Sequence, residues 1–284
     1  MEIKAPATYE EQYNKLLEHG CQIEDASFCK QALERISYYR LSAYFIPFRG
    51  KNGYIRGTSF RRVYRIYEFD RKMRNLLYGI IEEMEIYLRV QLAHEFAHMY
   101  GALGYLDPAN FSDHHKDDVF KQRVQKAITE NSNAPFVIHH LRKYDGQFPL
   151  WVIVEVFTFG MLSKFYADMK TQDRKALAAK LAGTSAQNLK SWLLCLTELR
   201  NLCAHYARLY NCPLKNVPRM PKDCGIAPSN MLFDDILVLK WLHFDPDAWR
   251  MEFMPRLTAL IEEYSEDIDL NKIGFPPNWE ALLQ

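Results

Sequence analysis

The sequence of 284 residues has few of the residues that mark several classes of protein. Its 12 glycines and 13 prolines are too few for a collagen-like chain or a long flexible linker. Its six cysteines form no CxxC pair, which indicates reduced thiols rather than a disulfide framework. The most apolar stretch, residues 150–162, contains a glutamate and is too short to span a bilayer. Residues 1–6 have no apolar run typical of a signal peptide, so the sequence indicates a cytoplasmic protein.

The whole chain has almost equal numbers of basic and acidic residues, but two of its regions each have an excess of one charge. The formal net charge is +1. Residues 30–90 contain 13 basic and 6 acidic residues, whereas residues 221–284 contain 5 basic and 12 acidic ones. Such a separation of charge indicates contact with nucleic acid, although solvated helix faces also produce it.

Helical periodicity is the most abundant signal. Apolar residues recur every three or four positions over residues 60–100, which predicts one long helix. The only strand signal is a small hairpin around residues 53–57. The sequence therefore predicts an all-α fold. Further helices are predicted over residues 9–19, 28–40, 116–131, 135–143, 151–169, 174–181, 186–210, 233–242 and 246–264.

The strongest candidate site lies near the end of the predicted helix 186–210. Asn201 and His205 are four residues apart and share a helix face, which Arg208 would extend by one turn. Arg200 lies about 100° around the axis from Asn201, and its long side chain can reach the same edge. Guanidinium groups bind phosphate oxygens, and an imidazole can exchange protons with a ribose 2′-hydroxyl or a departing 5′-oxygen. These residues suit metal-free cleavage of RNA, but they could equally form an ordinary polar network on a helix surface.

A second motif, His94-Glu95-Phe96-Ala97-His98, matches the HExxH pattern of zinc hydrolases. In that pattern two histidines bind zinc and the glutamate acts as a base. The extended form of the pattern requires a third histidine where this chain has Gly104. His114, His115 and Asp113 are conceivable substitutes, but nothing in the sequence favours them, so a zinc hydrolase is a remote alternative.

Two further features could contribute cations to a site. Arg89 and His94 lie in the long predicted helix, and Glu85 could form an ion pair with Arg89 one turn away. Basic and aromatic residues are interleaved from Tyr38 to Arg74, a mixture that can bind phosphates and stack on unpaired bases. The same pattern arises when the aromatics form a core and the arginines are solvated. The candidate RNA-binding residues are Arg40, Arg71, Arg74, Arg89 and Arg208.

Several blocks of the sequence resemble the Abi-like bacterial proteins, the abortive-infection proteins of AbiD and AbiF type. The blocks follow the order of that family and cover nearly the whole chain. They are Ile36–Tyr44, Tyr67–Arg74, Ile81–Arg89, Tyr100–Leu106, Pro149–Gly160, Arg200–His205 and Gly274–Trp279.

The resemblance implies a single all-helical unit containing a helical bundle of HEPN type. Residues 1–110 would form an additional, basic N-terminal helical region, and residues 111–284 would form the HEPN-like region. Arg200, Asn201 and His205 match the Arg-Asn-x3-His motif, which implies the active site of a metal-independent endoribonuclease. Such proteins resemble phage-defence and toxin ribonucleases, some of which work with a small RNA or a protein antitoxin. Neither His94 nor the HExxH pattern matches a family position.

Two hypotheses follow from the sequence. The first is an endoribonuclease without cofactor or metal, in which a 2′-hydroxyl attacks the adjacent phosphorus to give a 2′,3′-cyclic phosphate and a 5′-hydroxyl. Because one imidazole cannot easily be both base and acid in a single step, we expect a homodimer that lines one cleft with both copies of the motif. The second is a non-catalytic RNA-binding or sensing module of a defence system, whose binding weakens with salt. Neither involves a membrane.

Overall fold

A computed structural model describes residues 5–222 and 224–284. The first four residues, on which part of the expectation about a signal peptide depends, lie outside the described residues. None of the described helices has the combination of length and hydropathy that a membrane-spanning segment requires.

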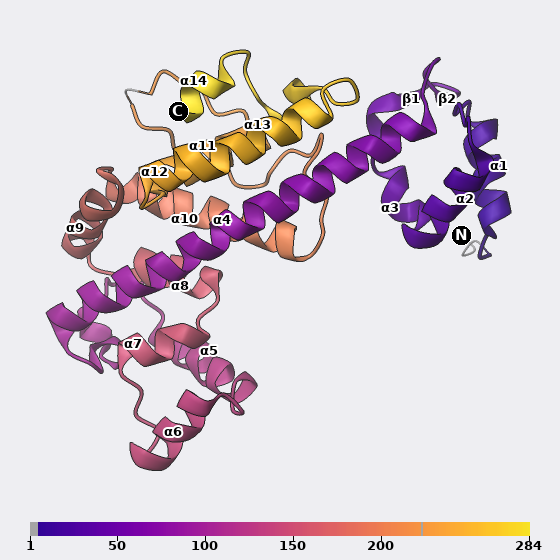
Figure 1. Ribbon diagram of the computed structural model, residues 1–284. Helices are drawn as coiled ribbons and strands as arrows, with labels where there is room; N and C mark the ends of the chain where they lie inside the picture. Colours follow the sequence, from indigo (N-terminus) through magenta and orange to yellow (C-terminus); the bar gives the residue numbers. More distant parts are fainter. Residues whose placement is uncertain (1–4, 223) are drawn as a thin grey trace.

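The fold is organised around one helix of 41 residues, α4 (Phe60–Tyr100), whose bounds agree with the prediction (Figure 1). Ser59 caps its start by accepting a hydrogen bond from the backbone N–H of Arg62. Gly101, with φ of +82°, ends it. The helix packs against α7 (Leu150–Ile153), α8 (Phe159–Asp168), α10 (Ala186–Ala204), α11 (Leu232–Leu242) and α13 (Met254–Glu263). Since it contacts most of the other long helices, α4 positions the remaining elements.

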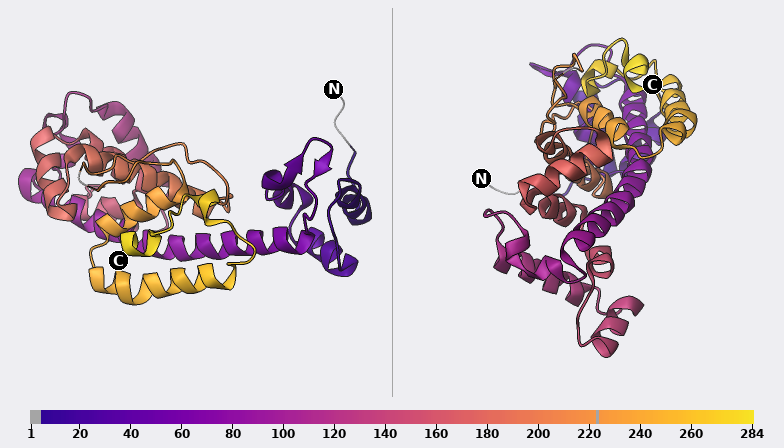
Figure 2. Two further views of the ribbon diagram at one scale, coloured as in Figure 1. Left: turned by 90° about the horizontal axis from the view of Figure 1, so that it is seen from above. Right: turned by 90° about the vertical axis from the view of Figure 1, so that its left-hand side faces the viewer.

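The N-terminal region packs around the beginning of α4, at one end of the molecule (Figure 2). Its elements are α1 (Tyr9–Glu18), α2 (Ala26–Arg35), α3 (Tyr38–Ser42) and a hairpin of β1 (Arg49–Gly50) with β2 (Gly53–Tyr54).

The structure confirms the predicted hairpin, but its strands have only two residues each. Arg49 pairs with Tyr54 and Gly50 with Gly53. A Cβ at position 53 would lie 2.5 Å from the carbonyl oxygen of His19, so only glycine fits there. The predicted continuous helix over residues 28–40 was wrong, because the chain is extended at Ile36, with φ of −130° and ψ of 99°, before the next helix begins.

The remaining chain is helical, which confirms the all-α prediction. The helices predicted to span residues 151–169 and 186–210 are both shorter than expected. The first is interrupted after Val156, and Thr158 caps the helix that follows. The bounds are α5 (Asp117–Glu130), α6 (Pro135–Lys143), α7 (Leu150–Ile153), α8 (Phe159–Asp168), α9 (Thr171–Ala182), α10 (Ala186–Ala204), α11 (Leu232–Leu242), α12 (Pro246–Ala248), α13 (Met254–Glu263) and α14 (Trp279–Leu283).

Ion pairs between α4 and the segment that begins with α13 explain part of the charge separation in the sequence. Arg65 Nε lies 2.8 Å from Asp267 Oδ2, and Lys72 Nζ lies 2.6 Å from Glu263 Oε1. Arg62 Nε also donates to the carbonyl oxygen of Asp267 at 3.0 Å. Part of the basic N-terminal third is therefore neutralised by the acidic C-terminal region, and these cations are less available to nucleic acid.

One buried carboxyl predicts a pH dependence of stability. Asp235 on α11 is 1% exposed, and neither of its oxygens has a hydrogen-bond partner among the described residues. Burial raises the pKa of Asp235 well above its usual value, with further repulsion from Asp234 and Glu198. An unfolded aspartate ionises near pH 4 while the folded one stays protonated, so stability falls as pH rises above about 4.

Asp235→Asn removes this ionisation and keeps the shape of the side chain. We expect its melting temperature to exceed that of the parent by a few degrees near neutral pH, and the difference to shrink toward about pH 4. Thermal unfolding followed by circular dichroism over this pH range measures the effect, with the exposed Asp113→Asn as control. A difference between parent and Asp235→Asn that is independent of pH would contradict the expectation.

Candidate functional site

The motif residues lie on the last turns of α10. Ser185 caps the start of this helix, and its apolar side packs against α4, α8, α9 and α11. Leu199 and Cys203 are buried on that side, and burial raises the pKa of Cys203 to about 12, so its thiol is not a nucleophile. Asn201 and His205 are exposed on another side of the helix.

Helix α10 ends at Ala204, and not at Tyr210 as predicted. His205 is the C-cap residue, and Tyr206 adopts a left-handed conformation with φ of +58°. The N–H of Tyr206 donates to Cys203 O at 3.2 Å, and the N–H of Ala207 donates to Leu202 O at 2.9 Å. This is a Schellman motif, in which glycine is the usual left-handed residue. A tyrosine there costs about 1–2 kcal/mol, so other contacts must hold the turn.

A buried ion pair on α4 supplies these contacts. Asp70 and Arg74 are 1% and 4% exposed, and Arg74 Nη1 lies 2.5 Å from Asp70 Oδ2. Asp70 Oδ1 accepts the backbone N–H groups of Leu209 and Tyr210 at 3.2 and 2.9 Å, and Arg74 Nη1 donates to Ala207 O at 3.1 Å. The segment directly after His205 is thus anchored to α4, which fixes where the imidazole emerges.

Arg200 faces α4 and shares a buried glutamate with Arg89. Glu85 is 6% exposed, and its two oxygens lie 2.5 Å from Arg89 Nη2 and 3.3 Å from Arg200 Nε. The predicted Glu85–Arg89 pair is therefore confirmed. The terminal nitrogens of Arg200 have no hydrogen bond within the described residues and adjoin a small cavity of about 200 Å³ that Arg89 and Tyr78 also line. Glu85 orients the Arg200 guanidinium through Nε, and the two terminal nitrogens keep donors that can bind a phosphate.

The chain brings only part of the predicted catalytic set into one pocket. Arg89 and Arg200 meet around Glu85, whereas Asn201 and His205 do not line that cavity. The side chains of Asn201 and His205 are exposed and have no hydrogen-bond partner in the part of the chain that the structure describes. Within six positions at the end of α10 there are therefore an imidazole, an amide and a guanidinium group, each with free polar atoms, but Arg200 faces α4 while Asn201 and His205 lie on another side of the helix.

The other predicted RNA-binding arginines have internal partners. Arg40 Nη1 donates to the carbonyl oxygen of Tyr206 at 2.6 Å, which places it beside the motif. Arg71 forms two hydrogen bonds with Glu68, at 2.9 and 3.1 Å. Arg208 is not on α10, and its Nη1 donates to two backbone carbonyls nearby at 3.0 Å each. Arg74 is the buried anchor described above and presents no surface to a ligand.

The HExxH residues do not assemble a metal site. The rings of His94 and His98 have centroids 4.0 Å apart and are tilted by 41° to one another, but Glu95 forms an ion pair with Lys180 at 2.6 Å. Among residues 5–222 and 224–284 no group of three potential ligands is close enough to hold a metal ion. His94 lines a cavity with Trp151, separate from the cavity that contains Arg89.

The contact between Glu85 and Arg200 was not predicted, because the two residues are far apart in sequence. A cluster of cations on α8, α9 and α10 was also missed, since each comes from a different helix. The only sequence signal for it is Lys190, which precedes Asn201 by three helical turns on the same face.

The sequence model of one protein family, described as "Abi-like protein", matches residues 31–211, well over half of the chain. The chain belongs to the Abi-like protein family. This family is associated with abortive infection, a form of phage defence. The match begins in α2, contains all of α4 and α10, and ends shortly after the motif, whereas the block at residues 274–279 lies outside it. No curated protein and no solved structure matched the chain.

Proposed function

We propose that this Abi-like protein is a metal-independent endoribonuclease of HEPN type that acts in phage defence or as a toxin. Arg200, Asn201 and His205 are its active-site residues. The observation that carries the proposal is the end of α10, where an exposed imidazole and an oriented guanidinium both keep unpaired donors. RNA is the substrate, and a small regulatory RNA or an antitoxin is proposed to restrain the activity.

The residues have distinct roles in the reaction. The 2′-oxygen of one ribose attacks the adjacent phosphorus and loses its proton to an imidazole, while the 5′-oxygen leaves with a proton from an imidazolium. Arg200 donates to the phosphate oxygens, whose charge increases in the phosphorane, and Asn201 holds the same phosphate in position. The products are a 2′,3′-cyclic phosphate and a 5′-hydroxyl.

A second copy of the chain would supply the second imidazole. The surface of α4 beside Arg89 and Arg200 carries exposed apolar side chains, which are Tyr78 at 38%, Ile86 at 53% and Val90 at 54% exposure. Exposed apolar groups around a polar site favour a protein interface. We propose that two copies associate across this face, so that both motifs line one cleft.

Incubation of the protein with RNA in EDTA tests the proposal against its alternatives. We expect cleavage to survive chelation, because in the proposed reaction imidazoles transfer the protons and Arg200 stabilises the charge on the phosphate, so that no metal ion is needed. Cleavage that is lost on chelation would support a metal hydrolase instead. Binding without cleavage would support the non-catalytic RNA-binding module and contradict the proposed activity.

A further inference from the structure

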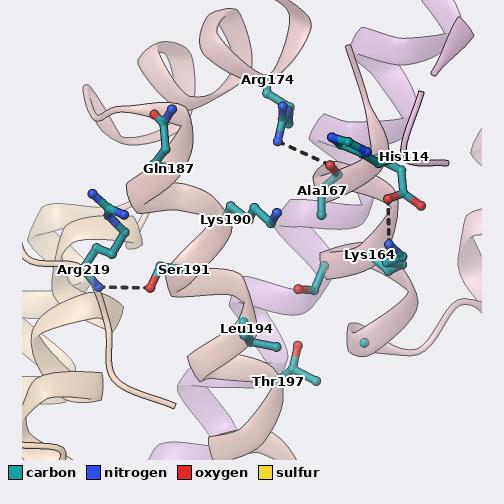
Figure 3. A pocket seen from close by; sticks show the side chains of 13 residues that line it. His114, Lys164, Ala167, Arg174, Gln187, Lys190, Ser191, Leu194, Thr197 and Arg219 are labelled. Carbon is teal, nitrogen blue, oxygen red and sulfur yellow. Dashed lines mark hydrogen bonds and ion pairs between the residues drawn. The ribbon is translucent and has the colours of Figure 1, made fainter. Parts of the chain in front are cut away.

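A cavity of about 680 Å³ lies between α8, α9 and the first turns of α10, separate from the pocket around Arg200. Four basic side chains surround it, each from a different segment (Figure 3). They are Lys164 on α8, Arg174 on α9, Lys190 on α10 and Arg219 in the segment between α10 and α11. No acidic residue other than Asp168 lines the described part of the cavity, so the lining has a clear excess of positive charge.

Most of this positive charge is not neutralised. Asp168 is engaged by Lys164 at 2.8 Å and by His115 at 3.2 Å. Arg174 donates only to uncharged oxygens, and its Nε has no hydrogen-bond partner among the described residues. Lys190 and Arg219 are exposed, and neither forms an ion pair within residues 5–222 and 224–284. A hollow with unpaired cations attracts anions, and guanidinium groups bind phosphate in particular.

The cavity and the motif share one face of α10. Lys190 and Asn201 are 11 residues apart in the sequence, so they point in directions about 20° apart and are separated by about 16 Å along the axis. Leu194 and Thr197 line the cavity between them. The same exposed face therefore leads from the cavity to Asn201 and His205.

The basic surface also continues away from the motif. A neighbouring cavity of about 290 Å³ shares Lys164 and Asp168 with the first and adds Lys116 and Arg123. Cations thus line two adjoining cavities, which is more than a single phosphate requires. This arrangement fits a polyanionic strand better than a small phosphorylated ligand.

We infer that the cavity binds the phosphate backbone of the RNA strand to one side of the scissile linkage. This inference rests on the proposed function, because it supplies the substrate that the motif would cut. None of the described lining residues is Phe, Tyr or Trp, so His114 is the one aromatic ring among them that could stack on a base. Binding there has little sequence preference and depends strongly on salt.

The test uses the full chain with His205→Ala, so that RNA is bound but not cut. Fluorescence anisotropy of a labelled single-stranded RNA is recorded over a range of salt concentrations, with and without Lys190→Ala and Arg219→Ala. We expect the two further substitutions to weaken binding at least about tenfold. They should also reduce the slope of log K against log salt by about 1.4, because each lost phosphate contact on a single strand contributes about 0.7.

The matched control is Arg142→Ala with Arg256→Ala, which removes two exposed cations, one from α6 and one from α13. It should change affinity by less than about twofold. Unchanged affinity and slope in the Lys190/Arg219 variant would overturn the inference. The absence of RNA binding, or binding of a mononucleotide in place of RNA, would also overturn it.

Cleavage assays separate failure of this inference from failure of the proposed function. With His205 present, the Lys190/Arg219 variant should show a raised KM and a kcat close to that of the parent. If the parent cuts no RNA while the variant loses RNA binding, the proposed function fails, and of the inference only the binding of an RNA backbone by the cavity stands. If the parent cuts RNA and the variant binds equally well, the cavity inference fails alone.

Discussion

Replacing His205 with alanine is expected to lower the rate of RNA cleavage by about 100- to 10,000-fold, the contribution usual for a general acid or base. The folded structure should be unaffected, because the side chain is exposed and makes no hydrogen bond within the described residues. Single-turnover cleavage of a labelled RNA measures the rate, and thermal unfolding checks the fold. The melting temperature should stay within the small range typical of surface substitutions.

The control for this variant is His139→Ala, which removes an exposed histidine from α6. It should cleave RNA at the parental rate. Undiminished cleavage by the His205→Ala protein would remove His205 from the mechanism, and with it the role assigned to the end of α10. An equal loss of activity in both variants would point to a general effect of histidine removal and would likewise contradict the assignment.

The largest expected effect on stability belongs to Asp70. Asp70→Ala deprives Tyr44, Arg74 and two backbone N–H groups of their acceptor and leaves the guanidinium buried without an anion. Removing one partner of a buried pair costs about 3–5 kcal/mol, which corresponds to a fall in melting temperature of about 10 °C or more. Because Asp70 also anchors the turn after His205, the remaining folded protein should cleave RNA more slowly.

Glu68→Ala provides a matched control one half-turn away on α4. Glu68 pairs with Arg71 at the surface, where the two side chains are 21% and 44% exposed. Loss of such a pair should reduce stability by less than about 1 kcal/mol. If calorimetry or chemical denaturation gave the same destabilisation for Asp70→Ala and Glu68→Ala, the anchoring role of the buried pair would be wrong.

The long helix could be predicted from the sequence because its signals are local. The apolar spacing, Ser59 at the start and Gly101 at the end all act within one turn of the position they determine. The end of α10 could not be predicted in this way. The left-handed residue is Tyr206 rather than glycine, and Asp70 holds the following turn from more than 130 residues away.

In the candidate site, too, local spacing could be predicted from the sequence but contacts between distant residues could not. The pairing of Arg200 with a histidine five residues later is visible in the sequence, and so is the helical spacing of Glu85 and Arg89. That Glu85 also orients Arg200 depends on how α4 packs against α10. Likewise, the basic N-terminal third suggested an RNA surface, yet Arg65 and Lys72 pair with acidic residues near the C-terminus. Three cations without an ion pair among the described residues, Arg174, Lys190 and Arg219, lie instead around a cavity that four separate segments build.

The proposed function requires that the end of α10 cleave RNA through the neighbouring 2′-hydroxyl. The most direct measurement is the chemical nature of the fragment ends formed in EDTA, on RNA and on the same strand with a single 2′-deoxyribose before the preferred linkage. We expect 2′,3′-cyclic phosphate and 5′-hydroxyl ends on the RNA and no cut at the deoxy-substituted linkage. Cutting of the deoxy-substituted linkage, or 5′-phosphate ends on the RNA, would contradict the proposed function.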